Sequence, residues 1–121
     1  MGLILIADNS ALERQRLKQI IESEGHIVVL ANNNKYCLEL IEVHRLNAAL
    51  LDPFLSGTKK LELRLLPALQ RRKIPVIVLA KQKKEQIYER CLRYEVVVAI
   101  LGEFPSDLEI KQNIAIALNN I

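Results

Sequence analysis

Aromatic residues are scarce in this sequence, and no apolar run is long. The chain has no Trp, three Tyr and two Phe among its 121 residues. A surface on which nucleic-acid bases stack needs several aromatic side chains, so we do not expect nucleic acid as a partner. No stretch approaches the roughly 20 apolar residues that cross a bilayer, and Asp8 interrupts the N-terminal run too early for a signal peptide. We therefore expect a cytoplasmic protein with no membrane contact.

Cysteine, histidine and glycine are also sparse. Cys37 and Cys91 lie far apart in predicted helices, which favours two reduced, partly buried thiols over a metal site. His26 and His44 are solitary, so no Ser/His/Asp or Cys/His catalytic set can be assembled. No glycine-rich loop follows the first apolar run, which excludes a P-loop and a dinucleotide-binding fingerprint. These absences indicate a protein that is not an enzyme.

Charge of neither sign dominates. The formal net charge is +3, from 17 basic and 14 acidic side chains. Basic residues cluster around Arg14, Arg71 and Lys83, but acidic residues are interleaved with the first and last of these clusters. This pattern is typical of solvated helix faces and leaves only a weak attraction toward acidic partners.

Short apolar runs alternate with amphipathic stretches along the whole chain. The five runs are residues 3–7, 26–30, 48–51, 76–79 and 96–100. Continuous apolarity favours strands that are covered on both faces, as in a parallel sheet. Alternation with helical stretches predicts an α/β fold with right-handed crossovers. We therefore expect a single domain over residues 1–121 in three layers, with a doubly wound five-stranded parallel sheet.

Local sequence features predict where several helices begin and end. Ser10 and Ser106 each precede a glutamate by three residues, which is the spacing of a capping box. Gly25 is suited to a helix C-terminus. Pro67 falls inside a predicted helix over residues 61–70, which it must kink or divide because proline lacks a backbone N–H.

Two carboxylates end predicted strands. Asp8 follows the first apolar run and Asp52 follows the third. Ligands of such sheets bind at the carboxyl ends of the strands, so both side chains point to the functional edge. Converging carboxylates repel one another unless a cation such as Mg²⁺ joins them, and a carboxylate beside that ion can attack a phosphoryl group. The alternative is that both residues only cap strand and helix ends.

Four segments carry a family resemblance that covers essentially the whole chain. In order, they are LILIADNS, AALLDPFLSG, IPVIVLA and AILGEFPSDL. Together they resemble the receiver domain of two-component response regulators. The resemblance implies a flavodoxin-like strand order 2-1-3-4-5, Asp52 as the candidate phosphoacceptor and a histidine kinase as its partner. It also implies a weak or vestigial Mg²⁺ site at Asp8, Asn9, Asp52 and the main-chain carbonyl of Phe54, with no other cofactor.

The chain departs from the family pattern around that pocket. Asn9 stands where the family has a second acid, and Ala80 stands where it has Thr or Ser. Gly102 and Glu103 replace the family's lysine and the proline that usually follows it, and Ala99 replaces the aromatic switch residue. We therefore expect the pocket to have lost a metal ligand's charge, a hydroxyl and its cation.

These departures favour an atypical, pseudo-receiver type of signalling domain that acts mainly through protein–protein contact, with weak or absent phosphorylation. The alternative is a functional Mg²⁺-dependent phosphoacceptor, phosphorylated on Asp52 by a histidine kinase. A small-molecule-binding domain of the same fold is a third hypothesis, but the sequence shows no cradle for a ligand.

A partner surface is expected at the end of the sheet. In the receiver fold the fifth strand is an edge strand, and residues 96–100 are apolar throughout. An exposed apolar edge favours association, although flanking helices can cover it. We predict that the fourth helix, fifth strand and fifth helix form a surface for a signalling partner or for a second copy of the chain.

Overall fold

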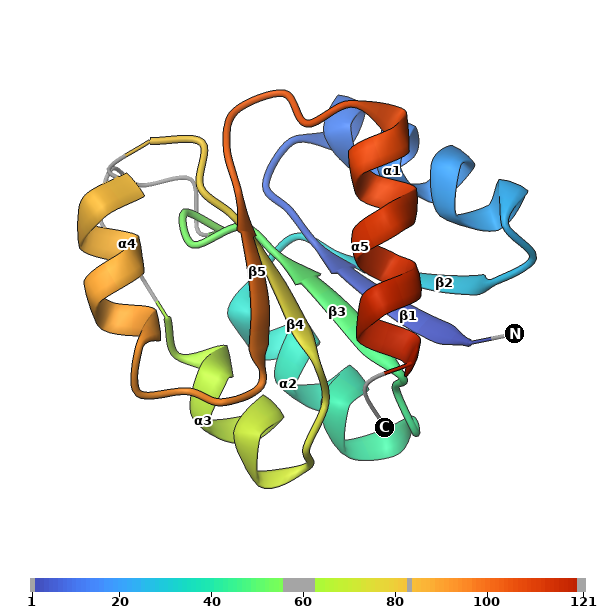
Figure 1. Ribbon diagram of the computed structural model, residues 1–121. Helices are drawn as coiled ribbons and strands as arrows, with labels where there is room; N and C mark the ends of the chain where they lie inside the picture. Colours follow the sequence, from blue (N-terminus) through green and yellow to red (C-terminus); the bar gives the residue numbers. More distant parts are fainter. Residues whose placement is uncertain (1, 56–62, 83, 120–121) are drawn as a thin grey trace.

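A five-stranded parallel sheet with helices on both faces forms the body of the molecule (Figure 1). The computed structural model describes residues 2–55, 63–82 and 84–119. The strands are β1 (Leu3–Ala7), β2 (Ile27–Ala31), β3 (Ala48–Leu51), β4 (Val76–Leu79) and β5 (Val97–Leu101). The helices are α1 (Ala11–Ser23), α2 (Asn34–Val43), α3 (Leu65–Arg71), α4 (Lys84–Cys91) and α5 (Asp107–Asn119).

The strand order in the sheet is β2-β1-β3-β4-β5. Each neighbouring pair of strands is parallel; for example, Ile4 of β1 lies beside Val28 of β2 on one side and Ala48 of β3 on the other. This order and the alternation of strands with helices confirm the predicted doubly wound α/β fold. They also place the carboxyl ends of all the strands at one edge of the sheet.

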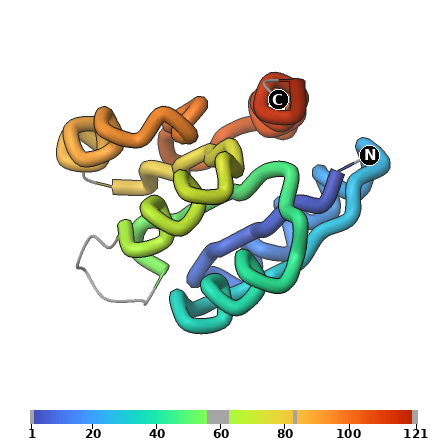
Figure 2. Tube along the Cα trace, turned by 90° about the horizontal axis from the view of Figure 1, so that it is seen from below, coloured from blue at the N-terminus to red at the C-terminus, as the bar shows by residue number. Residues whose placement is uncertain are grey.

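The core lies in two layers, one on each face of the sheet. Because side chains alternate along a strand, Ile4 and Ile6 pack with residues of α1 and α5, whereas Leu5 packs with residues of α2, α3 and α4. Figure 2 shows α5 and α2 on opposite sides of the strands. Burial on both faces explains why the central strands are continuously apolar.

The predicted helix ends are present, with one difference. The Ser10 hydroxyl accepts a hydrogen bond from the Glu13 backbone N–H at 3.2 Å, and the Ser106 hydroxyl accepts one from Glu109 at 3.1 Å. Gly25 follows α1 with a φ of 86°, a left-handed conformation that glycine adopts without strain. The Glu13 side chain pairs with Arg16 at 3.1 Å, so the first capping box is only half formed.

The structure corrects three details of the sequence prediction. β2 and β5 each begin one residue later than predicted. Pro67 neither kinks nor divides a helix, because it lies in the first turn of α3, where backbone N–H groups need no partner within the helix. Of the predicted helix over residues 61–70, residues 61–62 lie outside the described residues, and the structure begins α3 at Leu65.

The edge strand β5 carries an irregularity in its pairing with β4. Val76 lies beside Val97, but Ile77 lies beside Ala99, so Val98 is an extra residue on β5. One extra residue on one strand is the arrangement of a β-bulge. Among the described residues, no helix combines the length and the apolarity that crossing a membrane would require.

Candidate functional site

The carboxyl ends of β1 and β3 bring Asp8 and Asp52 into one pocket. The Asp52 backbone N–H donates to the Ala7 carbonyl at 2.8 Å, which holds the two strand ends together. Asp8 is 0% exposed and Asp52 is 3% exposed. Two carboxylates are thus withdrawn from water side by side, an arrangement that requires a counter-charge, proton sharing or both.

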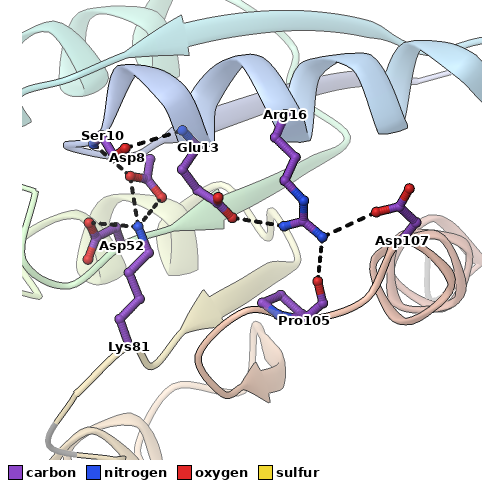
Figure 3. A network of polar contacts seen from close by, with 8 residues as sticks. All are labelled: Asp8, Ser10, Glu13, Arg16, Asp52, Lys81, Pro105 and Asp107. Atoms are coloured by element: carbon purple, nitrogen blue, oxygen red, sulfur yellow. Dashed lines mark hydrogen bonds and ion pairs between the residues drawn. The ribbon is translucent and has the colours of Figure 1, made fainter.

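Lys81 supplies that counter-charge. Its ammonium donates to both carboxylate oxygens of Asp8, at 2.9 Å to Oδ1 and 2.8 Å to Oδ2, and lies 3.7 Å from Oδ2 of Asp52 (Figure 3). Lys81 comes from the start of the loop after β4, and 31% of its side chain is exposed. The pocket therefore contains a cation that the sequence analysis did not expect, and it does not come from the end of β5, where Gly102 stands in place of the family's lysine.

Backbone groups complete the hydrogen bonding of the pocket. The Ser10 N–H donates to Asp8 Oδ1 at 2.8 Å, and the Phe54 N–H donates to Asp52 Oδ1 at 2.9 Å. Throughout the described part of the chain, no buried side-chain nitrogen or oxygen lacks a hydrogen-bond partner. The pocket is thus a satisfied polar network, which is the condition under which buried charge is tolerated.

The pKa of Asp8 reflects a competition between burial and its partners. Burial raises the pKa above the ordinary value of 3.8, and the nearby charge of Asp52 raises it further. The hydrogen bonds from Lys81 and Ser10 and the Lys81 charge act in the opposite direction, but burial prevails. The ionised carboxylate therefore depends on Lys81 more than an exposed carboxylate would.

Apart from Asn9, the positions predicted to have lost their groups lie in β5 or just after β4 and β5. Ala80 is buried and its N–H donates to the Leu101 carbonyl at 2.7 Å, whereas Ala99 is half-buried against the α5 side of the sheet. A Cβ added to Gly102 would meet no atom within 4 Å, so the backbone does not require glycine there. Glu103 is exposed and, with Lys81, lines a hollow of about 230 Å³.

The residues present do not fit Mg²⁺ while Lys81 holds its place. Asn9, predicted as a neutral ligand, is exposed, and both oxygens of Asp8 already accept bonds from the ammonium. Within the described ranges, no group of three or more His, Cys, Asp or Glu side chains is arranged to hold a metal ion. Phe54, predicted as a ligand through its carbonyl, contacts the pocket through its backbone N–H, which donates to Asp52.

A second polar cluster closes the rim beside the pocket. Arg16 on α1 pairs with Glu13 at 3.1 Å and with Asp107 at 3.2 Å, and it donates to the Pro105 carbonyl at 2.5 Å (Figure 3). These contacts tie the loop that follows β5 to the first helix. The loop that holds Gly102 is thereby fixed next to the acidic pocket.

Sequence reasoning missed Lys81 because the family pattern directs attention to the ends of β1, β3 and β5 for charge. A clue was present: Lys81 directly follows Ala80, at the carboxyl end of the predicted fourth strand. That edge is where Asp8 and Asp52 end their strands, and a lysine has four methylene groups with which to reach them. Its position made Lys81 a candidate for the pocket, but the direction of its side chain is visible only in the structure.

Comparisons with known proteins agree on the fold. The model of the response regulator receiver domain matches residues 4–114. NtrX from Brucella abortus is 19% identical, with a TM-score of 0.86 over 98% of this chain and 27% of that one. The signal receiver domain of a modulated diguanylate cyclase from Desulfovibrio desulfuricans G20 is 18% identical, with a TM-score of 0.86 over 99% of this chain and 95% of that one.

A third similar structure carries a metal. The receiver domain of the sensor histidine kinase PA1611 from Pseudomonas aeruginosa PAO1, with a magnesium ion in its active site cleft, is 17% identical. Its TM-score is 0.79, over 98% of each chain. The present chain spans about a quarter of the length of NtrX. Sequence identities of 17–19% with these three structures establish the fold alone. The family match, which covers nearly the whole chain, shows that the protein belongs to the response regulator receiver domains of two-component signal transduction.

Proposed function

We propose that this chain is an atypical receiver domain that signals mainly through protein–protein contact, with weak or absent phosphorylation of Asp52. The observation that carries the proposal is the contact of the Lys81 ammonium with both oxygens of Asp8. In this arrangement a positive charge from the chain itself already occupies the acidic pocket. A metal-assisted reaction at Asp52 would first have to displace two charge-assisted hydrogen bonds, at a cost of roughly 3 kcal/mol.

The groups missing around Asp52 support the same proposal. Ala80 offers no hydroxyl, Gly102 offers no ammonium and Asn9 offers no charge to a metal ion. Removing one preorganised donor to a developing oxyanion typically slows a reaction by about a hundredfold or more. The effects of several such losses need not add, but each acts against phosphoryl transfer. Mg²⁺, if bound at all, is expected to bind weakly.

Intact mass measurement after incubation with acetyl phosphate and Mg²⁺ tests the proposal. We expect little or no addition of a phosphoryl group to the wild-type protein, and none to an Asp52→Asn control. Stoichiometric addition that disappears in the control would establish the alternative, a functional phosphoacceptor, and would overturn the proposal.

The pocket also defines what a repair would need. Restoring Asn9→Asp, Ala80→Thr and Gly102→Lys supplies the missing acid, hydroxyl and cation, and the space at Gly102 accommodates a side chain. We expect these three changes to raise phosphorylation only modestly while Lys81 remains, and more when Lys81→Met is added. Beryllofluoride binding by the folded variants measures the gain. Equal binding with and without Lys81→Met would mean that Lys81 does not limit the site.

We propose the α4-β5-α5 surface as the contact with a signalling partner, which includes a histidine kinase or a second copy of the chain. A groove of about 320 Å³ runs along β5, lined by residues of α4 and β5. Tyr88 is 51% exposed and Leu92 is 77% exposed, and both line this groove. Exposed apolar side chains around a groove are typical of protein-binding surfaces.

Analytical ultracentrifugation tests the version with a second copy. We expect association that grows with concentration and that weakens in a Leu92→Asp variant. A strict monomer at high concentration would exclude the homodimer and leave a different signalling protein as the partner, which a binding assay with a cognate kinase would then examine.

The remaining parts of the proposal follow from the family. We infer that residues 1–121 form one receiver domain, that the domain is not itself an enzyme, and that it works in the cytoplasm without binding nucleic acid. Limited proteolysis that leaves the whole chain as one protected fragment would support the single domain. Cell fractionation tests the location.

A further inference from the structure

We propose that Lys81 is the resident cation of the acidic pocket: its tethered ammonium takes the place between Asp8 and Asp52 and makes the domain insensitive to divalent metal ions. The proposal deepens the proposed function and rests on it for the role of the pocket. It makes a separate claim, because it concerns which cation the pocket holds rather than whether Asp52 is phosphorylated.

The geometry distinguishes Lys81 from an ordinary surface ion pair. Its ammonium binds both oxygens of a carboxylate that is 0% exposed, and a second buried carboxylate lies 3.7 Å away. The other ion pairs of the described residues, such as Lys18 with Glu22, join partially exposed side chains on both sides. Among the ion pairs of the described residues, those of Lys81 alone involve buried carboxylates, so water offers little compensation for the loss of its charge.

Among the described residues, no other basic side chain forms an ion pair with Asp8 or Asp52. Arg14 also lies near Asp8, but its guanidinium donates to the main-chain carbonyl of Asp8, at 2.7 Å, and not to the carboxylate. Within the described residues, the ion pairs of Asp8 and Asp52 are made by Lys81. In the described part of the chain, Lys81 therefore supplies the positive charge that faces these two carboxylates.

Lys81 and a divalent ion would compete for the same oxygens. Mg²⁺ and Mn²⁺ bind carboxylate oxygens directly, and Asp8 presents both of its oxygens to the ammonium. The lysine also has the advantage of being attached to the chain, which makes its local concentration independent of the solution. Removing its charge leaves two unneutralised carboxylates, which is the condition that attracts a divalent ion.

Metal titration of matched variants tests the inference. We would titrate Mn²⁺ and Mg²⁺ into wild type, Lys81→Met, Lys84→Met and Lys81→Met/Asp52→Asn at neutral pH, by calorimetry and by the shift in melting temperature. Lys84 is an exposed lysine at the start of α4, so Lys84→Met controls for the loss of one positive charge nearby.

We expect Lys81→Met to bind one Mn²⁺ at least about tenfold more tightly than wild type, because no ammonium has to leave the carboxylates. Lys84→Met should behave as wild type, and Asp52→Asn should abolish the gain. Wild type that binds Mn²⁺ as tightly as folded Lys81→Met would overturn the inference. That result would also remove the Lys81 argument for the proposed function, which would then rest on the groups missing at Asn9, Ala80 and Gly102. The two failures remain distinguishable, because metal titration tests the inference and phosphorylation of Asp52 in the wild type tests the proposed function.

A second measurement tests the inference without Lys81→Met, in case that variant does not fold. In ¹⁵N-labelled protein, an ammonium group that is hydrogen-bonded to a buried carboxylate exchanges slowly enough to give a distinct lysine Nζ resonance. We expect one such resonance, unchanged by millimolar Mg²⁺ and lost in Asp8→Asn. Its disappearance on addition of Mg²⁺ to the wild type would show that the metal displaces Lys81 and would overturn the inference.

Discussion

The acidic pocket and the β5 edge lie in the same sheet but meet their surroundings in opposite ways. In the pocket, every buried polar atom of the described side chains has a partner, and Lys81 balances the carboxylates from within the chain. Along β5, four of the five residues are only partly buried, and the groove beside them is lined by apolar and aromatic side chains together with Glu95. The pocket is satisfied internally, whereas the edge is open.

This difference indicates which of the two regions gains more from binding another molecule. A polar network with all of its bonds made gains little from an added ligand, because each new contact must replace one that exists already. Exposed apolar side chains in a groove, in contrast, gain free energy when a partner covers them. The pocket of this receiver domain differs from a reactive one because its bonds are already made. This difference supports the proposal that the domain acts through its β5 surface.

The largest expected effect is the destabilisation caused by Lys81→Met. We expect the free energy of unfolding to fall by roughly 2–4 kcal/mol, because the substitution leaves buried carboxylates without their cation; partial exposure of Lys81 places the cost below that of a fully buried pair. Urea unfolding measures the change. The double variant Lys81→Met/Asp8→Asn should lose less than Lys81→Met alone, and a greater loss would contradict the pairing.

The pH dependence of stability tests the balance at Asp8. Because burial raises its pKa above 3.8, Asp8 favours the folded state at low pH, and this contribution is lost as the pH rises through the pKa of the folded state. We therefore expect the stability of wild type relative to Asp8→Asn to decrease from about pH 3 to pH 7. A relative increase over that range would mean that the Lys81 contacts outweigh burial.

Substitutions at the edge should change association but hardly change stability. Tyr88→Ser and Leu92→Ser remove side chains that are 51% and 77% exposed, so we expect the free energy of unfolding to change by no more than about 0.5 kcal/mol. Urea unfolding and sedimentation of the same samples compare the two properties. A large loss of stability would show that the groove belongs to the core.

The smallest effect is expected in the reactivity of the two thiols, one of which lines the β5 groove while the other lies in the core. Burial raises the pKa of the Cys37 thiol to about 12 and raises that of Cys91 as well, so both should react slowly with a thiol reagent in the native protein. Cys91 lines the β5 groove, so it should be modified before Cys37. Unfolded protein should show two free thiols, and fewer would contradict the free cysteines of the structure.

The sequence allowed the prediction of features that depend on local pattern. The apolar runs predicted the strands, Ser10 and Ser106 predicted helix starts, and the strand-end positions of Asp8 and Asp52 predicted their convergence. Each follows from a short-range rule about periodicity, capping or strand polarity.

Lys81 could not be predicted in the same way. Its side chain crosses from the end of β4 to the end of β1, a contact between residues 73 positions apart. Its direction is set by burial of Asp8 and by the rotamers of a flexible side chain, neither of which appears in a sequence pattern. The family pattern was also misleading, because glycine at position 102 suggested a pocket without a lysine. The pattern compares the residues at matched positions and does not show which side chains reach the pocket.

The extra residue on β5 has a consequence for strand addition at this edge of the sheet. An unbroken apolar edge strand is a template on which other chains add strands, the first step toward aggregates with amyloid-like pairing. Val98 interrupts the regular ladder, and bulges of this kind twist an edge away from such pairing. The irregularity therefore disfavours the addition of further strands to β5 and lowers the tendency of this edge to aggregate. Contacts through side chains remain favourable.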